Sequence, residues 1–171
     1  RRRSARALRE PAGTSEQVAW LALGLAVAGL ALPLRALAAL APLQLLALAA
    51  SLLADGRYEL TNVPAIDDVA IMGELLAALG VRAHSPEPGR LILDNDGDLV
   101  PLAPYELVER IRASINVLGP LLTRCGEIRL SMPGGDDFGP RPIDMHLHSL
   151  ERLGATFETA HGYIEGRADH L

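Results

Sequence analysis

The sequence predicts an α/β fold built from repeated units of strand, helix and hairpin, and two observations support that prediction. First, a helix end, a glycine, a strand and a proline follow one another at residues 52–64 and again at residues 121–133. Second, each copy continues into a helix and a hairpin, with turns expected at Pro88-Gly89 and His161-Gly162. Units of this kind stack, because each covers the apolar face of its neighbour.

The first copy opens with the end of a helix. Gly56 terminates it, because a glycine readily takes the left-handed conformation just past a helix end. Alternating apolar and polar residues then predict a strand up to Pro64, with one face buried. Asp67 suits the N-terminus of the next helix, which is expected to end at Gly80. Residues 81–84 begin the hairpin.

Residues 105–122 connect the two copies, and apolar residues at helical spacing predict one long amphipathic helix there. In the second copy a strand is expected between Gly126 and Pro133. The helix that follows is expected between Asp144 and Gly154, and a hairpin completes the copy as it does in the first.

The two copies differ most at residues 134–142, which are inserted before the second helix. Three glycines, two aspartates and an arginine lie in this insertion. A repeat needs no such loop for packing, and rigid scaffolds carry binding and catalytic groups on loops. Glycine, aspartate and proline are also ordinary turn residues. Composition alone therefore leaves a ligand-binding loop and a surface turn equally open.

Composition excludes several classes of protein. The formal net charge of −5 gives no basic footprint for nucleic acid. Cys125 is the single cysteine in the sequence, so no internal disulfide framework exists, and a reducing compartment such as the cytoplasm is expected. All sixteen basic residues are arginine, and the chain has no lysine.

Residues 1–44 form an atypical segment rich in alanine, leucine and arginine, distinct from the domain expected at 45–171. A basic start and an uncharged run at residues 18–34 suggest a signal peptide or a membrane anchor. Against that interpretation, the run is short for a span and contains Gly24, Gly29 and Pro33. We expect a buried helical region and no membrane association. A membrane-tethered interaction protein is the alternative.

Four motifs, at residues 112–115, 118–121, 132–136 and 139–146, closely resemble those of UDP-N-acetylglucosamine 1-carboxyvinyltransferases. The resemblance runs from about residue 45 to residue 168, roughly the first third of that family's usual length. It implies the enolpyruvyl transferase fold, in which two inside-out α/β domains enclose the active site. This chain would be part of one domain, and the C-terminal domain of the enzyme would be missing.

The resemblance also implies an activity. Members of the family transfer the enolpyruvyl group of phosphoenolpyruvate to the 3'-hydroxyl of UDP-N-acetylglucosamine, the first committed step of peptidoglycan synthesis. This step serves cell wall biogenesis, cell shape and the cell cycle. It needs no cofactor and no metal. His146 and His148 do not alter that expectation, because two helical residues at this spacing point to different faces.

The site residues implied by the resemblance lie in two of the motifs. The family's loop acid matches Asp136, where most members carry cysteine and a minority, including actinobacterial ones, carry aspartate. Asp137 is the weaker candidate for this acid. Fosfomycin inactivates the family by alkylating the loop cysteine, so Asp136 implies fosfomycin resistance.

The substrate-binding residues are implied in the same way. Arg112 matches an arginine at the sugar-nucleotide site, and Arg141 matches one that also reaches toward phosphate. The residues that follow Arg141 match the segment that binds UDP-N-acetylglucosamine: Pro142, Ile143, Asp144 and Met145. Structural explanations are open for two of these residues, Arg112 as a solvent-facing helix residue and Asp144 as a helix-start residue. We interpret Arg110 and Arg124 as solvent-facing.

One departure from the family is plain. A Lys-Asn pair whose lysine contacts phosphoenolpyruvate is expected at Ala41-Pro42, and the lysine is absent. A frameshift or joining error before residue 45 is the favoured explanation. The alternative is an inactive or repurposed paralogue that binds a sugar nucleotide without catalysis. In both cases the 171-residue chain alone is expected to be inactive.

Overall fold

The computed structural model describes residues 41–133 and 143–171, and it confirms the predicted α/β class. The first unit contains a helix, a strand, a second helix and a hairpin: α3 (Ala41–Ala50), β1 (Gly56–Thr61), α4 (Asp67–Ala78), β2 (Arg82–Glu87) and β3 (Arg90–Asn95). The second unit repeats that order: α6 (Leu118–Cys125), β5 (Glu127–Ser131), α7 (Asp144–Glu151), β6 (Thr156–Ala160) and β7 (Tyr163–Arg167). Three short elements join the units: β4 (Leu102–Ala103), α5 (Tyr105–Val108) and the 3-10 helix η1 (Arg112–Val117).

Strand pairing confirms that the two copies are structural repeats. In the first unit the order is β1-β3-β2, and in the second β5, β7 and β6 pair in the corresponding order. All of these pairs are antiparallel, and β4 adds to the second sheet in parallel beside β5. The ends of α4 and α7 also match, because Val81 N–H donates to the Leu76 carbonyl at 2.9 Å and Ala155 N–H to the Leu150 carbonyl at 3.0 Å.

The predicted turns lie where the sequence places them. Gly89 and Gly162 have φ values of 80° and 79°, in the left-handed region that glycine enters without strain. Gly126, at φ 73°, ends α6, and its N–H donates to the Leu122 carbonyl at 3.0 Å. The glycine signals therefore predict both hairpins and the end of this helix. The prediction for Gly56 is wrong, because α3 already ends at Ala50 and Gly56 is the first residue of β1, with φ 141°.

The long helix predicted at residues 105–122 is wrong, because the chain breaks there into α5, η1 and α6. Ile111 is extended, with φ −136° and ψ 139°. The Ser114 hydroxyl lies 2.7 Å from the Ile111 carbonyl and 3.1 Å from the Val108 carbonyl, a local alternative to helical hydrogen bonding. Pro120 has no N–H to donate within a continuous helix and lies instead in the first turn of α6.

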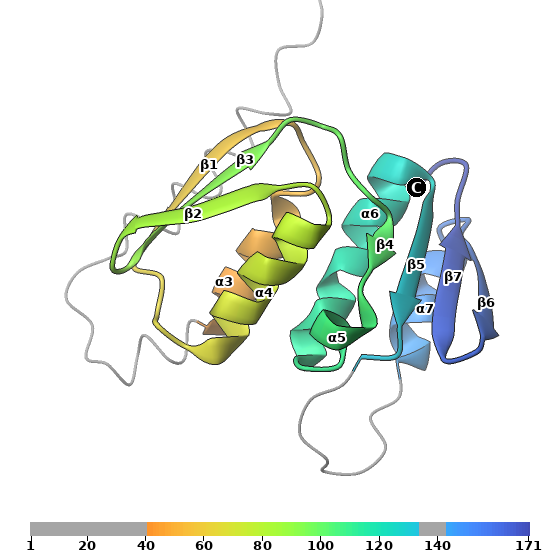
Figure 1. Ribbon diagram of the computed structural model, residues 1–171. Helices are drawn as coiled ribbons and strands as arrows, with labels where there is room; N and C mark the ends of the chain where they lie inside the picture. The colour runs from red at the N-terminus through yellow and green to blue at the C-terminus, as the bar shows by residue number, and fades with distance from the viewer. Residues whose placement is uncertain (1–40, 134–142) are drawn as a thin grey trace, which may run out of the picture.

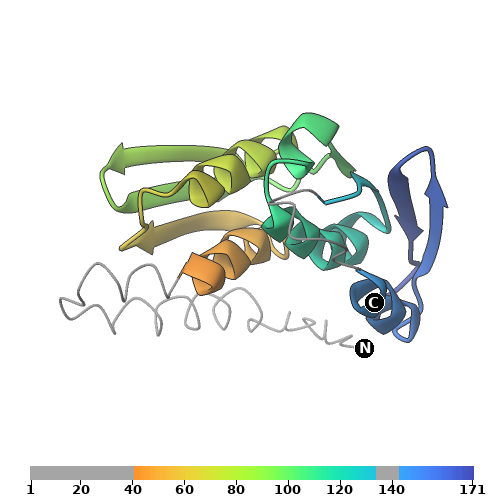
Figure 2. The ribbon, with the colours of Figure 1, turned by 90° about the horizontal axis from the view of Figure 1, so that it is seen from below.

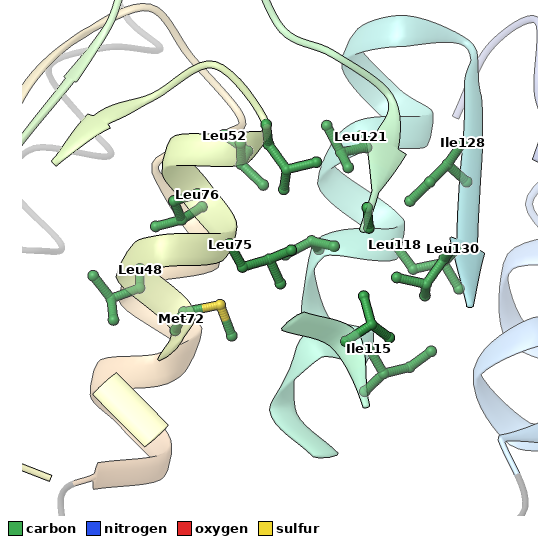
Figure 3. Close-up of a cluster of buried hydrophobic side chains, with 14 of the residues drawn as sticks. Leu48, Leu52, Met72, Leu75, Leu76, Ile115, Leu118, Leu121, Ile128 and Leu130 are labelled. Carbon is green, nitrogen blue, oxygen red and sulfur yellow. The ribbon is translucent and has the colours of Figure 1, made fainter. Parts of the chain in front are cut away.

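The helices α3, α4, α5 and α6 lie between the two sheets, as the inside-out arrangement requires (Figure 1). The helix α7 packs against β6 in the second sheet and has no buried residue. Figure 2, a view from below, shows the same separation of the two sheets. Side chains from α4 face those of η1, α6 and β5 across one continuous core (Figure 3). Burial of a leucine side chain is worth about 1.5–3 kcal/mol, so this layer is the main stabilising feature. Its largest fully buried members include Leu48, Leu52, Met72, Leu75, Leu76, Leu118, Leu121 and Leu130.

No helix within residues 41–133 and 143–171 has the length and apolar character to cross a membrane. The uncharged run at residues 18–34, which raised the membrane interpretation, lies outside the described part of the chain.

Candidate functional site

The candidate site surrounds the connection from β5 to α7, at the end of the molecule where α5 also lies (Figure 1). On one flank of this connection Ser131 is fully buried at the end of β5, and on the other Ile143 is 4% exposed at the start of α7. Both flanks are therefore anchored in the core. An anchored strand end and helix start form a rigid support for the groups between them.

Several predicted site residues lie outside the described part of the chain. These are Asp136, Asp137, Arg141 and Pro142. The structure places the remaining four, Arg112, Ile143, Asp144 and Met145, at the starts of two different helices.

Arg112 is the first residue of η1 and is half-buried. Its neighbours on the chain hold its backbone firmly, since Ile111 and Ile115 are 2% and 6% exposed and Ser114 is fully buried. The η1 helix packs against α3, α4, α5 and α6. The backbone that carries Arg112 is therefore rigid, which favours recognition of an anionic ligand by a guanidinium group.

The two arginines interpreted as solvent-facing differ from each other. Arg110 is exposed and pairs with Glu74 at 2.8 Å, in agreement with that interpretation. For Arg124 the interpretation is wrong, because its side chain is only 24% exposed and is paired with Asp55. Arg124 joins the two repeat units, a role that no helical pattern could indicate.

The start of α7 combines a buried residue with two exposed ones. Ile143 precedes the helix, Asp144 is its first residue, and Met145 is 77% exposed. A carboxylate in the first turn is favoured by the helix dipole, so the structural explanation of Asp144 is supported. Its exposure, and that of Met145, leaves both side chains accessible to a ligand as well.

His146 and His148 lie on α7, as expected, and both are exposed. His148 is paired with Glu151 through an Nδ1–Oε2 distance of 3.2 Å. Over residues 41–133 and 143–171, no group of three histidine, cysteine or acidic side chains is arranged to hold a metal ion.

Cys125 is the single cysteine in the sequence, so its thiol is the group whose reactivity as a nucleophile matters here. It is the last residue of α6, outside the β5–α7 connection, and is half-buried. Burial raises the pKa of the thiol, nearby Arg124 lowers it to a smaller extent, and Glu127 raises it further. The thiolate fraction at neutral pH is accordingly small, so Cys125 is a poor nucleophile.

Two buried hydroxyl groups near the site were not identified from the sequence. The Ser114 hydroxyl is bonded to the Val108 and Ile111 carbonyls, and the Ser131 hydroxyl has no hydrogen-bond partner among the described residues. Both serines interrupt apolar stretches, Ser114 between Ala113 and Ile115 and Ser131 between Leu130 and Met132. A polar residue at a core position was the signal available in the sequence.

Repeated α/β units with helices enclosed between two outer sheets define the enolpyruvyl transferase class of fold. Residues 41–169 match the EPSP synthase (3-phosphoshikimate 1-carboxyvinyltransferase) family, and the chain belongs to that family. The enolpyruvyl transferase NikO from Streptomyces tendae is similar in structure, with a TM-score of 0.63 and 29% identity over 76% of this chain and 28% of NikO. EPSP synthase from Acinetobacter baumannii, at TM-score 0.52 and 16% identity over 71% of this chain and 29% of its own, shares the fold.

Curated relatives narrow the resemblance to one branch of the family. Proteins named UDP-N-acetylglucosamine 1-carboxyvinyltransferase are 47% identical in Nitratidesulfovibrio vulgaris over 124 residues and 49% identical in Desulfatibacillum aliphaticivorans over 125 residues. A third, from Acidiphilium cryptum, is 50% identical over 120 residues. These matches cover 70–72% of this chain and 28–30% of the relatives. The chain thus spans less than a third of their length.

Proposed function

We propose that this chain is part of a UDP-N-acetylglucosamine 1-carboxyvinyltransferase, which joins phosphoenolpyruvate to UDP-N-acetylglucosamine in peptidoglycan synthesis. The observation that carries the proposal is 47–50% identity to proteins of that name over 70–72% of the chain. This is well above the 29% identity to NikO and the 16% identity to EPSP synthase. A cytoplasmic location, and roles in cell wall biogenesis, cell shape and the cell cycle, belong to the same proposal.

The reaction proceeds by addition and elimination. A proton is added to the methylene carbon of phosphoenolpyruvate, and a bond forms between its C2 atom and the 3'-oxygen of the sugar, which loses its own proton. The tetrahedral intermediate then loses phosphate from C2 and a proton from the new methyl group. Both substrates are strongly anionic, so guanidinium groups suit their phosphate and diphosphate oxygens through paired hydrogen bonds.

In this proposal Arg112 and Arg141 bind substrate, with Arg141 also directed toward phosphate. Pro142, Ile143, Asp144 and Met145 form the segment that binds the sugar nucleotide. The anchored Ile143 and the accessible Asp144 and Met145 support that assignment.

Asp136 is proposed as the general acid that protonates the methylene carbon. An exposed aspartate has a pKa of about 3.9 and is a weak source of protons at neutral pH. Exclusion of water by bound substrate, together with phosphate oxygens nearby, would raise the pKa of this carboxyl and make it an effective acid.

One observation favours a second candidate function. The chain contains no lysine, so the family's lysine contact to phosphoenolpyruvate is absent, and Ala41 and Pro42 begin α3 at the matching position. A protein that binds the sugar nucleotide through Arg112 and Arg141 without catalysis would need no such lysine.

The full-length gene product tests these alternatives through the adjacent aspartates. Asp136→Asn should lower turnover by about 10²–10⁴-fold, the usual contribution of a general acid, while calorimetric affinity for UDP-N-acetylglucosamine is retained. Asp137→Asn is the matched control and should leave turnover nearly unchanged. Normal turnover in Asp136→Asn would refute the assignment of the acid. Sugar-nucleotide binding without turnover in the unsubstituted protein would favour the non-catalytic function.

A further inference from the structure

Ser114 lies in η1, two residues after Arg112, close to the break that separates α5 from η1. Its side chain is fully buried, and its hydroxyl oxygen lies 2.7 Å from the Ile111 carbonyl and 3.1 Å from the Val108 carbonyl. A hydroxyl carries one proton, so the two carbonyls share a single donor. The hydroxyl therefore joins the end of α5 to the residue that precedes η1.

The hydrogen bond of the Ser114 hydroxyl restrains the backbone turn that contains Arg112. Ile111 is extended, whereas Arg112 begins the 3-10 turn, so the direction of the chain changes between these two residues. The backbone N–H of Ser114 lies 3.4 Å from the Ile111 carbonyl, a long hydrogen bond, whereas the hydroxyl lies closer. The side chain is thus the shorter of the two links that close the turn containing Arg112.

Packing leaves this turn little freedom to adjust. Ile111 and Ile115 are 2% and 6% exposed, and η1 contacts four neighbouring helices. If the hydroxyl were removed, the Val108 carbonyl at the end of α5 would lose its side-chain donor in a buried setting, which favours rearrangement of the turn. Arg112 is the first residue of that turn and would move with it.

We infer that Ser114 is a positioning residue, which holds the guanidinium of Arg112 in the orientation that binds the sugar nucleotide. The inference rests on the proposed role of Arg112. Ser114 touches no ligand in this account and acts only through the backbone of the turn.

A matched control separates positioning from stability. Ser51 is also buried, at 2% exposed, and its hydroxyl donates to the Leu48 carbonyl at 2.7 Å near the end of α3. Ser51→Ala and Ser114→Ala each remove one buried hydroxyl of the same type. Both should lower the Tm of the full-length gene product by similar amounts.

Calorimetric Kd for UDP-N-acetylglucosamine is the measurement that distinguishes the two serines. We expect Ser114→Ala to raise Kd by about 5- to 10-fold, which corresponds to the loss of about one hydrogen bond, because Arg112 is then less well oriented. Ser51→Ala should leave Kd unchanged. Ser114→Cys keeps the volume and a weak donor, so it should raise Kd by a smaller factor and covers the case in which the alanine variant does not fold. Equal Kd values for all three variants and the unsubstituted protein would overturn the inference.

The double variant shows whether Ser114 acts through Arg112. In an Arg112→Ala background, Ser114→Ala should have no further effect on Kd, because the group it positions is absent. A full additional loss would refute positioning. If Arg112→Ala itself leaves Kd unchanged, the proposed role of Arg112 fails. If only Ser114→Ala leaves Kd unchanged, the inference about Ser114 fails by itself.

Discussion

Arg124, in the last turn of α6, forms an ion pair with Asp55, which lies between α3 and β1. The two residues stand near corresponding helix ends of the two repeat units, 69 positions apart. Arg124 is largely covered, whereas the Asp55 side chain is 63% exposed. The Asp55 carboxylate also lies against Gly97, where an added Cβ would meet its Oδ1 atom at 3.0 Å. One carboxylate thus contacts both the second unit and the loop after β3.

We expect this ion pair to contribute modestly to stability. A double-mutant cycle with Asp55→Ala and Arg124→Ala should give a coupling free energy of about 0.3–1 kcal/mol, because the exposed carboxylate remains hydrated. Urea unfolding of the unsubstituted protein, the two single variants and the double variant measures this coupling free energy. About 1 M NaCl should reduce the coupling free energy by screening the two charges. Strictly additive effects would mean that the pair does not stabilise the contact between the units.

Two glycines of the first unit should respond in opposite directions to alanine. Gly80 has φ 103°, and an added Cβ would lie 2.4 Å from the Asp98 carbonyl oxygen, so Gly80→Ala should destabilise by more than about 1 kcal/mol. Gly73 lies within α4 with nothing within 4 Å of an added Cβ, so Gly73→Ala should stabilise by about 0.5–1 kcal/mol. Thermal unfolding decides, and equal shifts would contradict the difference in backbone conformation.

Tyr58 should make stability sensitive to alkaline pH. Its hydroxyl donates to the Ala54 carbonyl at 2.7 Å, and burial raises its pKa above the usual value of 10.0, with Arg124 opposing and Asp55 adding to the shift. Because the folded pKa is the higher one, this stabilisation is full below the unfolded pKa. It is lost as the pH rises through the folded pKa.

Tyr58→Phe tests that dependence. The variant lacks one hydrogen bond and should be less stable near pH 8 by about 0.5–1.5 kcal/mol. Near pH 11 the gap should narrow, because ionisation then favours the unfolded state of the unsubstituted protein only. Urea titrations at both pH values measure the gap, and a gap of constant size would show that the phenol does not titrate differently on folding.

Fosfomycin should not inactivate the full-length gene product. Opening an epoxide needs a strong, soft nucleophile, and the loop position is occupied by Asp136 instead of cysteine. Cys125, the one cysteine of these 171 residues, has its pKa raised by burial. Asp136→Cys should introduce sensitivity and retain activity, since a thiol can also donate the proton. Mass spectrometry after incubation with drug and UDP-N-acetylglucosamine provides the readout. An adduct on the unsubstituted protein, at either residue, would contradict the assignment of the loop.

Local signals in the sequence determined the order of elements and the repeat. Gly89, Gly126 and Gly162 take positive φ values at the turns and at the helix end that they predict, because the left-handed conformation is a property of the single residue. The helix starts at Asp67 and Asp144 follow for the same reason, since a carboxylate is favoured by the backbone groups directly beside it. The order of the motifs along the chain likewise predicts Arg112 and Asp136 as site residues, a prediction that the substitutions proposed above test.

Tertiary structure alone decided the break in residues 105–122, the partner of Arg124 and the arrangement of the buried serines. The periodicity of apolar residues in this segment is consistent with one long helix. The hydrogen bonds of the Ser114 hydroxyl to the Val108 and Ile111 carbonyls, which compete with helical bonding, are seen only in the folded structure. Arg124 and Asp55 meet because two distant units stack, a contact that no local pattern encodes. Helix propensity and turn chemistry act over a few residues, whereas burial and ion pairing depend on which surfaces the whole fold brings together.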